Sequence, residues 1–301
     1  MGIRWMPIDD DERAPLFRPP GEAGSVIVRV AYGCPWNRCT FCGMYKGVRY
    51  GVRALEDVLR DLRAAARDEA DAQRLFLADG DVMALPWPYL EAVLREACVV
   101  FPRLARISLY ANGRSIQEKG DEVLAQMRAL KVHTLYMGLE SGDEELLRAV
   151  SKRETAGEMA DACRRAQAAG LRMSVMVLLG LGGRAGSARH AARTAEALNQ
   201  MQPRLLSVLR CMPIPGTAWH TAVTGGALDE LSEADAVAEL RALIGGLELP
   251  RTVFRANHVS NVVPLEGRFP HDKARMLAEL DALLRSGRLE TRGPGRRPLF
   301  L

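Results

Sequence analysis

Short apolar runs alternate with longer segments of helical periodicity six times between Ser25 and Thr217. These runs predict buried strands at Val26–Ala31, Arg74–Ala78, Arg106–Ala111, Thr134–Leu139, Arg172–Leu179 and Leu205–Cys211. Strands that alternate with helices form parallel sheets with right-handed crossovers. Polar residues and glycines follow most of the strands directly, and barrels build their active sites at the carboxyl ends of strands. We therefore expect an α/β fold whose sheet curls into a partial barrel.

Further segments extend this core at both ends. The first 24 residues are rich in Pro, Asp and Arg, which predicts an irregular arm. Beyond the sixth strand, periodicity predicts the helices Ser232–Leu249 and His271–Leu284, with the irregular polar segment Arg255–Gly267 between them. We expect three parts: an N-terminal arm (1–24), the barrel (25–220), and a helical extension that caps the barrel (221–301).

Composition and charge narrow the class of protein. The 301 residues include 41 basic and 37 acidic side chains, a formal charge of +4. Part of this surplus lies in the tail, at Arg292, Arg296 and Arg297, which favours a solvated terminus over a nucleic-acid surface. No run approaches the roughly 18 apolar residues that span a membrane, and the N-terminus lacks the apolar core of a signal peptide. We expect a cytoplasmic protein with reduced cysteines.

The loop after the first predicted strand reads GCPWNRCTFCGMYK. Cys34, Cys39 and Cys42 are separated by four and then two residues, and Phe41 precedes the last of them. Three thiolates this close can hold three corners of one iron–sulfur cluster and leave the fourth iron open. A structural zinc site needs a fourth ligand at finger-like spacing, which this stretch lacks. Cluster binding is therefore favoured, with zinc as the alternative.

The pattern CxxxxCxFC after a first strand resembles the cysteine loop of the radical SAM (S-adenosylmethionine) superfamily, in which the first gap usually has three residues. The resemblance covers roughly Ser25–Thr217 and implies a partial (β/α)6 TIM-like barrel. It implies that Cys34, Cys39 and Cys42 hold a [4Fe–4S] cluster beside Phe41, and that SAM binds the open iron. It also implies reductive cleavage of SAM to a 5′-deoxyadenosyl radical, which abstracts hydrogen from a substrate inside the barrel.

Polar groups follow the second and third strands. Asp79, Gly80 and Asp81 stand where the superfamily has a Gly-Gly-Glu-like motif for the SAM ammonium; Gly80 and Asp81 match that motif and Asp79 departs from it. A carboxylate suits an ammonium group, and a solvated turn is the alternative. At the third strand, Tyr110 is expected to line the substrate pocket. Asn112 is expected either to contact SAM or substrate or to form a plain turn.

The fourth strand runs into Glu140 and Ser141 within the motif GLESG. Glu140 ends an apolar run, so its carboxylate is expected to be partly buried and to need a partner. Lys152 or Arg153 can supply that partner, and so can an ammonium group or a pair of ribose hydroxyls. GLESG resembles a motif with which many radical SAM enzymes contact SAM. We therefore expect Glu140, Ser141 and Arg153 in the cofactor site, with a purely structural Glu140–Arg153 pair as the alternative.

The fifth and sixth strands end in glycines and backbone groups. The fifth contains Ser174 and is followed by Gly180, and glycine allows a flat ligand to approach the backbone. The resemblance implies adenine contacts here and at Met212 beyond the sixth strand. Neither a P-loop nor a dinucleotide fingerprint fits these glycines. Cys211 is a candidate reactive thiol, with a small buried apolar residue as the alternative.

The segment FRANHVSN, Phe254–Asn261, is a polar loop without charge repeats. We expect it to close over the substrate, with Asn257, His258 and Asn261 as candidate catalytic residues. A histidine can act as acid or base near neutral pH, and a satisfied structural histidine is the alternative.

These motifs together indicate a radical SAM enzyme, an oxidoreductase. The mostly neutral lining favours a small organic substrate, and the chemistry needs an electron donor such as flavodoxin or ferredoxin. One alternative is group transfer or another cleavage of SAM with the same cofactors. The other is a non-catalytic iron–sulfur or zinc carrier or sensor, which has no need of SAM.

Overall fold

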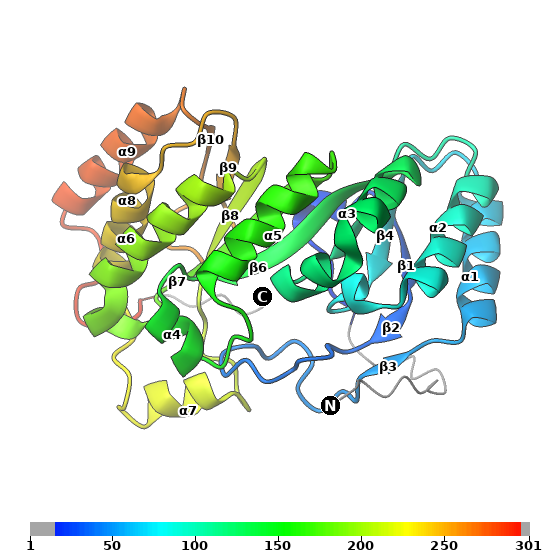
Figure 1. Cartoon of the computed structure of the whole chain (residues 1–301). Coiled ribbons are helices and arrows are strands. Elements are labelled where there is room, and N and C mark those ends of the chain that lie inside the picture. The colour runs from blue at the N-terminus through cyan, green and yellow to red at the C-terminus, as the bar shows by residue number, and fades with distance from the viewer. Residues whose placement is uncertain (1–15, 296–301) are drawn as a thin grey trace. The chain divides into compact units, whose positions relative to one another are not determined.

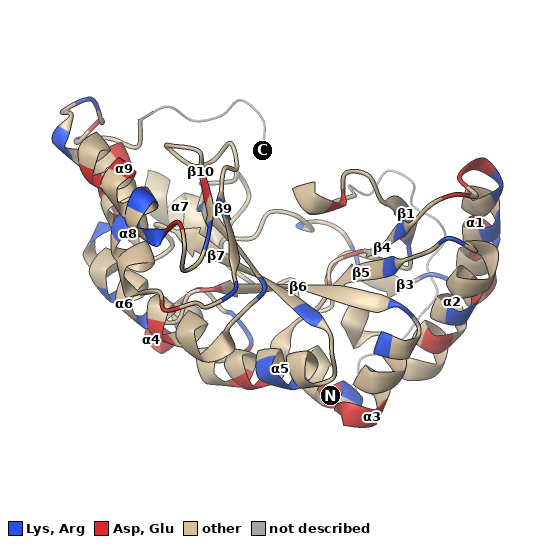
Figure 2. Cartoon of the chain, turned by 90° about the horizontal axis from the view of Figure 1, so that it is seen from above, with Lys and Arg blue, Asp and Glu red and all other residues tan. Residues whose placement is uncertain are grey.

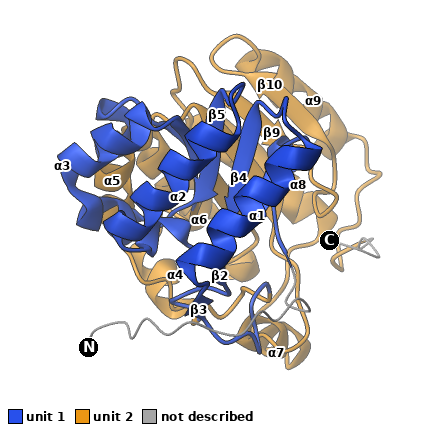
Figure 3. Cartoon of the chain, turned by 90° about the vertical axis from the view of Figure 1, so that its right-hand side faces the viewer, with its two compact units in different colours: residues 1–37, 44–137, 165–173 blue, residues 38–43, 138–164, 174–301 orange. Residues whose placement is uncertain are grey.

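The computed structural model describes residues 16–295, and these form two compact units (Figure 3). Among them, unit 1 consists of residues 16–37, 44–137 and 165–173, and unit 2 of residues 38–43, 138–164 and 174–295. The first 15 residues of the predicted arm, and Arg296 and Arg297 of the basic tail, lie outside the described part of the chain.

Unit 1 is built on parallel strands. In order across the sheet they are β1 (Val26–Arg29), β4 (Arg74–Ala78), β5 (Arg106–Tyr110) and β6 (Val132–Glu140), whose last three residues belong to unit 2. After its first residue β4 is fully buried, which is typical of a parallel strand covered on both faces. Its bounds are those predicted from the sequence.

Three helices connect the strands of unit 1: α1 (Leu55–Asp68), α2 (Trp87–Val100) and α3 (Gly113–Ala129). Helix α1 buries Val58 and Leu62, four residues apart on one face. Figure 1 shows α1 and α2 side by side against β1 and β4. Helix α3 consists of two helical segments that join across Gly120, whose φ is 75°.

A short antiparallel pair closes the cysteine loop of unit 1. It consists of β2 (Ala31–Tyr32) and β3 (Gly51–Val52), with Tyr32 opposite Gly51. The predicted first strand is therefore divided into β1, which pairs with β4, and β2, which pairs with β3.

Unit 2 has four strands in the order β7 (Arg172–Leu179), β8 (Leu205–Arg210), β9 (Val253–Ala256) and β10 (Leu265–Arg268); the first two residues of β7 belong to unit 1. The first three strands are parallel, and β10 runs antiparallel to β9. The described helices of this unit are α4 (Glu144–Ala149), α5 (Ala156–Ala168, of which 165–168 belong to unit 1), α6 (Gly183–Met201), α7 (Ala218–Thr224), α8 (Glu233–Gly246) and α9 (Lys273–Arg285).

The polar segment Arg255–Gly267 is not irregular throughout, as the sequence suggested. Its two ends form the β9–β10 hairpin, in which Arg255 stands opposite Glu266 and forms an ion pair with it. Cross-strand pairs of opposite charge stabilise such ribbons. The sequence also gave no sign of α7, which Thr217 caps by accepting a hydrogen bond from the backbone N–H of His220.

Charged residues occur mainly along helices such as α1 and α9, and the strands are mostly uncharged (Figure 2). Within residues 16–295, none of the helices combines the length and apolar character that crossing a bilayer requires.

Candidate active site

In unit 1 the cysteine loop lies directly against the turn that follows β4. The backbone N–H of Gly80 donates to the carbonyl of Gly33 at 3.1 Å. A Cβ atom at Gly80 would lie 2.8 Å from that oxygen and 2.9 Å from the Cβ of Cys34. Only glycine fits at this position, so the first cysteine and the Asp79–Asp81 turn form one packed unit.

Asp79 ties the same turn to the cysteine loop through its side chain. It is 1% exposed, accepts a hydrogen bond from the Tyr45 hydroxyl at 2.8 Å, and lies 3.3 Å from the Arg29 guanidinium. Burial raises the pKa of Asp79 to about 6, although Tyr45 and Arg29 act in the opposite direction. Asp79 therefore acts as an anchor for the loop.

Asp81 is held by the start of α3. One of its carboxylate oxygens accepts a hydrogen bond from Asn112 Nδ2 at 3.0 Å, and the other accepts one from Ser115 Oγ at 2.9 Å. Ser115 Oγ also accepts from the backbone N–H of Asn112 at 3.0 Å. The structure thus brings together the predicted Asp81 and Asn112, and the helix start fixes the direction of the carboxylate.

Tyr110 lies in an aromatic group with Phe76 and Tyr136, and its ring centroid is 5.3 Å from that of Phe76. Burial raises the pKa of Tyr110, and the charge of Asp79 adds to the effect. Its hydroxyl therefore stays protonated at neutral pH, as a donor in the interior of unit 1.

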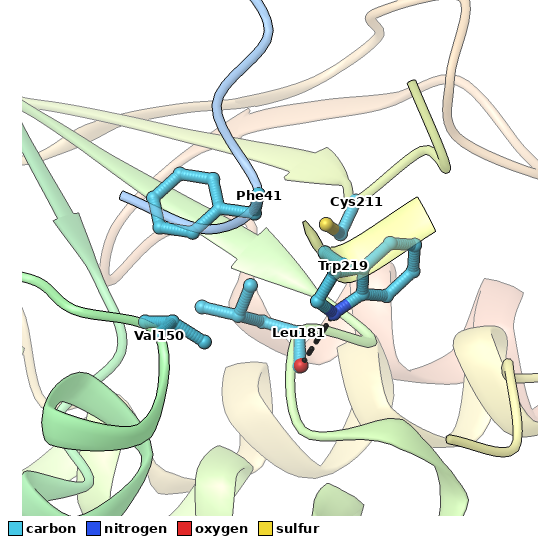
Figure 4. Close-up of a cluster of buried hydrophobic side chains, with 5 residues drawn as sticks. All are labelled: Phe41, Val150, Leu181, Cys211 and Trp219. Carbon is cyan, nitrogen blue, oxygen red and sulfur yellow. Dashed lines mark hydrogen bonds between the residues drawn. The ribbon is translucent and has the colours of Figure 1, made fainter. Parts of the chain in front are cut away.

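In unit 2 the remaining cysteines lie against an apolar cluster. Phe41 packs with Val150, Leu181, Cys211 and Trp219 (Figure 4). This cluster also contacts Cys39 and Cys42. The Trp219 indole donates to the carbonyl of Leu181 at 3.0 Å, so its polar end is satisfied inside this cluster. Phe41 therefore anchors the second half of the cysteine loop.

Backbone hydrogen bonds fix the same half of the loop. Thr40 donates to the carbonyl of Val150 at 2.9 Å, and the N–H of Trp219 donates to the carbonyl of Thr40 at 3.0 Å. A Cβ atom at Gly43 would meet Ile214 at 2.5 Å, so the loop also closes tightly on the segment after β8.

Cys211 and Met212 follow β8 and are both buried. Burial raises the pKa of the Cys211 thiol well above its usual range. Buried neutral thiols of this kind usually pack as small apolar groups. A role for Cys211 at the reacting atoms stays a prediction, as does an adenine contact at Met212.

Glu140, at the end of β6, pairs with Lys152. The Lys152 ammonium lies 3.2 Å from Glu140 Oε1, donates to the carbonyl of Gly138 at 2.7 Å, and is 7% exposed. Burial alone lowers the pKa of Lys152, but the charges of Glu140 and Cys39 outweigh it and raise the pKa above its ordinary value. Arg153 is exposed, so the inward cation is its neighbour.

Replacing Lys152 with methionine is expected to lower the free energy of unfolding by about 3 to 5 kcal/mol, because a buried carboxylate is left without its partner. Urea unfolding measures this. The double variant Lys152→Met with Glu140→Gln should recover part of the loss. Arg114→Met, which breaks the exposed Arg114–Glu118 pair, should cost less than about 1 kcal/mol. Equal effects at the two sites would contradict a buried ion pair.

The structure separates other predicted residues. Ser174 lies near the start of β7 and Gly180 just after its end; six residues of strand correspond to about 20 Å. Ser141 is fully buried, and its Oγ accepts from the N–H of Asp143 at 3.0 Å and lies 2.7 Å from His190 Nδ1. Direct contact of these residues with SAM stays a prediction.

The FRANHVSN segment is not, as predicted, a loop throughout: residues 254–256 belong to β9, and residues 257–261 form the loop that follows it. The N–H of Ser260 donates to Nδ1 of His258 at 3.2 Å, so Nδ1 carries no proton. Ser260 Oγ accepts from the N–H of Arg210 and lies 2.8 Å from Nδ1, to which it can donate its hydrogen. Burial lowers the pKa of His258. The ring is therefore neutral at neutral pH, with its proton on Nε2.

The two asparagines of this loop differ in their environment. Asn261 donates from Nδ2 to the carbonyls of Val208 at 2.8 Å and Ala256 at 2.9 Å, and so joins β8 to β9. Asn257 is exposed and donates to Glu266 at 3.2 Å. Asn261 therefore has a structural role in the described chain, and Asn257 and His258 keep side-chain atoms that a ligand can reach.

Several contributors were missed by sequence reasoning. Tyr45, Arg29, His190 and Glu239 all have partners distant in sequence, so no local pattern marks them. Lys152 was considered only as one of two partners for Glu140.

The cysteine donor set fits a cluster. All six cysteines are thiols, and the three of the loop are partly exposed. Within residues 16–295, no three His, Cys, Asp or Glu side chains converge closely enough to hold a single metal ion. Soft thiolates suit iron–sulfur clusters.

Comparison with known proteins gives a consistent result. The family model of the Radical SAM superfamily matches residues 28–195, more than half of the chain. No curated protein matches the sequence.

Solved structures with similar folds include TsrM from Kitasatospora setae, a radical S-adenosylmethionine methyltransferase with cobalamin and a [4Fe–4S] cluster bound. It has a TM-score of 0.55 and 19% identity, over 67% of this chain and 39% of that one. Coproporphyrinogen III oxidase (HemN) from Escherichia coli, a radical SAM enzyme, has a TM-score of 0.56 and 18% identity, over 73% of this chain and 52% of that one. Elp3 from Methanocaldococcus infernus has a TM-score of 0.56 and 13% identity, over 90% of this chain and 65% of that one.

At these identities the likeness shows the fold. It confirms the predicted class: α/β, with mostly parallel strands arranged as in the partial (β/α)6 TIM-like barrel. The chain spans less than two thirds of the length of each of these three proteins.

Proposed function

The chain belongs to the radical SAM superfamily, and on that premise we propose that it cleaves SAM reductively and abstracts hydrogen from a small organic substrate. It is a radical SAM enzyme, and its cofactors are a [4Fe–4S] cluster and SAM. The observation that carries the proposal is the fit of Gly80 against Cys34, because it builds the cysteine loop and the Asp79–Asp81 turn as one piece. A structural thiol loop needs no such carboxylate turn.

Cys34, Cys39 and Cys42 would hold the cluster. When bound, the cluster and SAM together supply a 5′-deoxyadenosyl radical. The chain's own residues bind the cluster and SAM and orient them. Asp79 and Tyr45 anchor the part of the cysteine loop in unit 1, and Phe41 anchors the part in unit 2.

Asp81 and Glu140 are the carboxylates that we assign to the cationic groups of SAM. Asp81 is oriented by two neutral donors, Asn112 and Ser115. Glu140 is held by Lys152, whose charge also suits the carboxylate of SAM. The remaining contacts assigned to SAM come from Phe41, Asp79, Gly80, Asn112, Ser141, Arg153, Gly180 and Met212; Ser174 lies at the opposite end of β7 and is left out.

We assign the substrate side to Tyr110, Cys211, Asn257 and His258, and not to Asn261, whose amide joins β8 to β9. His258 presents Nε2–H as a neutral donor, since Nδ1 is used by Ser260. These groups carry no charge at neutral pH, which favours a small organic molecule. We also propose that the enzyme is an oxidoreductase that works in the cytoplasm. Its proposed electron donor is a flavodoxin or ferredoxin. The division into an arm (1–24), a barrel (25–220) and a cap (221–301) is also part of this proposal.

Replacing Asn257 and His258 with alanine is expected to lower substrate turnover about 100-fold, the usual contribution of a positioned acid or base. SAM binding and substrate-free SAM cleavage should be unchanged. The matched control is Asn261→Ala, which should lower the melting temperature because it unpairs two strand carbonyls. Equal loss of SAM cleavage in the Asn257/His258 variant would contradict the assignment.

The test of the proposed function is EPR spectroscopy and metal analysis of anaerobically reconstituted protein, with and without SAM. We expect about four irons per chain, a reduced-cluster signal that changes when SAM is added, and 5′-deoxyadenosine as product. Zinc instead of iron, or a cluster signal that SAM leaves unchanged, would favour a carrier or sensor. A methylated product without 5′-deoxyadenosine would favour group transfer.

A further inference from the structure

Two turns that follow neighbouring strands in sequence, the GLESG turn after β6 and the glycine turn after β7, are fastened to the same buried pair of side chains. The pair is His190 on α6 and Glu239 on α8, which are 1% and 3% exposed. A buried histidine and a buried carboxylate are costly unless they are hydrogen-bonded.

The turn after β6 is held by α6. Ser141 Oγ lies 2.7 Å from His190 Nδ1, and Thr194 Oγ1 accepts from the N–H of Gly142 at 2.9 Å. His190 and Thr194 are four residues apart and so lie on one helix face. A Cβ atom at Gly142 would lie 2.1 Å from the carbonyl oxygen of Arg193, so the turn packs directly on the helix backbone.

The turn after β7 is held by α8. Gly180 has a φ of 77°, a conformation that favours glycine, and its N–H donates to Glu239 Oε1 at 2.7 Å. Ser187 also hydrogen-bonds to this carboxylate. Glu239 thus fixes the position of the backbone at the exit of β7.

The two holders face each other. His190 Nε2 lies 3.7 Å from Glu239 Oε1, and the carbonyl of Leu178 also faces the ring. Ser141 Oγ accepts from the N–H of Asp143 and makes a second hydrogen bond with His190 Nδ1. The 3.7 Å between His190 Nε2 and Glu239 Oε1 is longer than a hydrogen bond, so the two side chains meet through packing and charge.

We propose that His190 and Glu239 are positioning residues for SAM, which hold the GLESG turn and Gly180 at the separation that the bound cofactor requires. This inference rests on the proposed function, because it assumes that SAM binds at these two turns. Hydrogen bonds fix distance and direction more narrowly than apolar contacts do. A polar pair placed between α6 and α8 can therefore set the spacing of two turns, which leucines packed there would not do.

The first test measures the Kd of SAM on reconstituted protein by titrating its effect on the cluster EPR signal. Removing one charge-assisted hydrogen bond corresponds to roughly a tenfold change in Kd. His190→Leu and Glu239→Leu should each weaken SAM about tenfold. Glu239→Gln, which keeps an acceptor for Gly180, should stay within about threefold of wild type.

Thr252→Val is the matched control. It removes one buried hydrogen bond, from Thr252 to the carbonyl of Pro203 at 2.6 Å, near the opposite ends of the strands of unit 2. It should lower the melting temperature and leave the Kd of SAM within about twofold. A Kd that rises as the melting temperature falls in all variants, the control included, would overturn the positioning role.

Hydrogen exchange on the cluster-free protein gives an independent readout. The amides of Gly142 and Gly180 should exchange faster in the leucine variants than in wild type. In Thr252→Val they should exchange at the wild-type rate. If a leucine variant does not fold, Thr194→Val tests the same turn, because Gly142 then loses its acceptor. Unchanged SAM affinity and unchanged exchange in that variant would overturn the inference.

The pH dependence of the melting temperature reports on Glu239 itself. Burial raises the pKa of Glu239 to about 7 and lowers that of His190 to about 4. A raised carboxyl pKa gives stability that is present below the ordinary value near 4.5 and is lost as pH rises through about 7. Glu239→Gln should remove the part of the decline in melting temperature with rising pH that comes from Glu239. The other charged groups near the pair are Asp143, Asp235 and Arg189.

The outcomes separate the two proposals. A wild-type cluster that does not respond to SAM contradicts the proposed function. A wild-type cluster that responds, with leucine variants that bind SAM as tightly as wild type, contradicts only the positioning role.

Discussion

Replacing Cys34, Cys39 and Cys42 together with alanine should reduce the iron content from about four atoms per chain to almost none. SAM cleavage should fall below detection, since no electron source remains in the protein. The fold should persist, because the loop is also held by Asp79–Tyr45 in unit 1 and by Phe41 in unit 2. Iron analysis, EPR spectroscopy and circular dichroism measure the three effects.

The control for this variant uses two cysteines outside the loop. Cys98 contacts the carbonyl of Leu130 and Cys163 that of Met201, both through sulfur. The double variant Cys98→Ser and Cys163→Ser should keep its iron and its response to SAM. Retention of four irons by the triple alanine variant would show that other ligands hold the cluster.

Replacing Gly80 with alanine should cost most of the iron, although no ligand is changed. The added Cβ would lie 2.9 Å from the Cβ of Cys34 and 2.8 Å from the carbonyl oxygen of Gly33. Backbone atoms cannot rotate away, so the first cysteine must move. Overpacking of this kind costs about 1 to 3 kcal/mol of stability, and we expect less than one quarter of the wild-type iron after reconstitution.

Gly186→Ala is the matched substitution. Gly186 lies within α6, and a Cβ atom there meets nothing within 4 Å. Alanine should stabilise the helix by about 0.5 to 1 kcal/mol and leave the iron content unchanged. If Gly80→Ala also kept its iron, the close contact between the β4 turn and the cysteine loop would not matter for cluster binding.

Much of the fold could be read from local patterns. Strands β4 and β7 have the bounds that the apolar runs predict, because glycines or charged residues end those runs sharply. The β9–β10 hairpin was missed because its four-residue strands carry Arg255 and Glu266, which look like loop residues until they are paired.

The site was predictable where a motif is continuous in sequence, as in the cysteine loop and GLESG. The site was less predictable where only one of two residues adjacent in the sequence points into the interior. Lys152 and Arg153 are adjacent cations, and the backbone turn at Ser151, with φ of 56°, determines that Lys152 reaches Glu140. His190 and Glu239 are 49 residues apart on two different helices, and no pattern within either helix indicates that they meet.

The short β2–β3 ladder has a consequence for how the cysteine spacing can vary. It joins Tyr32 to Gly51 and so clamps both ends of an 18-residue segment. The entropy of closing such a segment grows only with the logarithm of its length, so one added residue changes the closure free energy by less than about 0.1 kcal/mol. The longer gap between Cys34 and Cys39 is therefore almost neutral thermodynamically. In a clamped segment of this kind, chain entropy places almost no limit on ligand spacing, and the packing of Cys34 against Gly80 and of Phe41 in its cluster sets it instead.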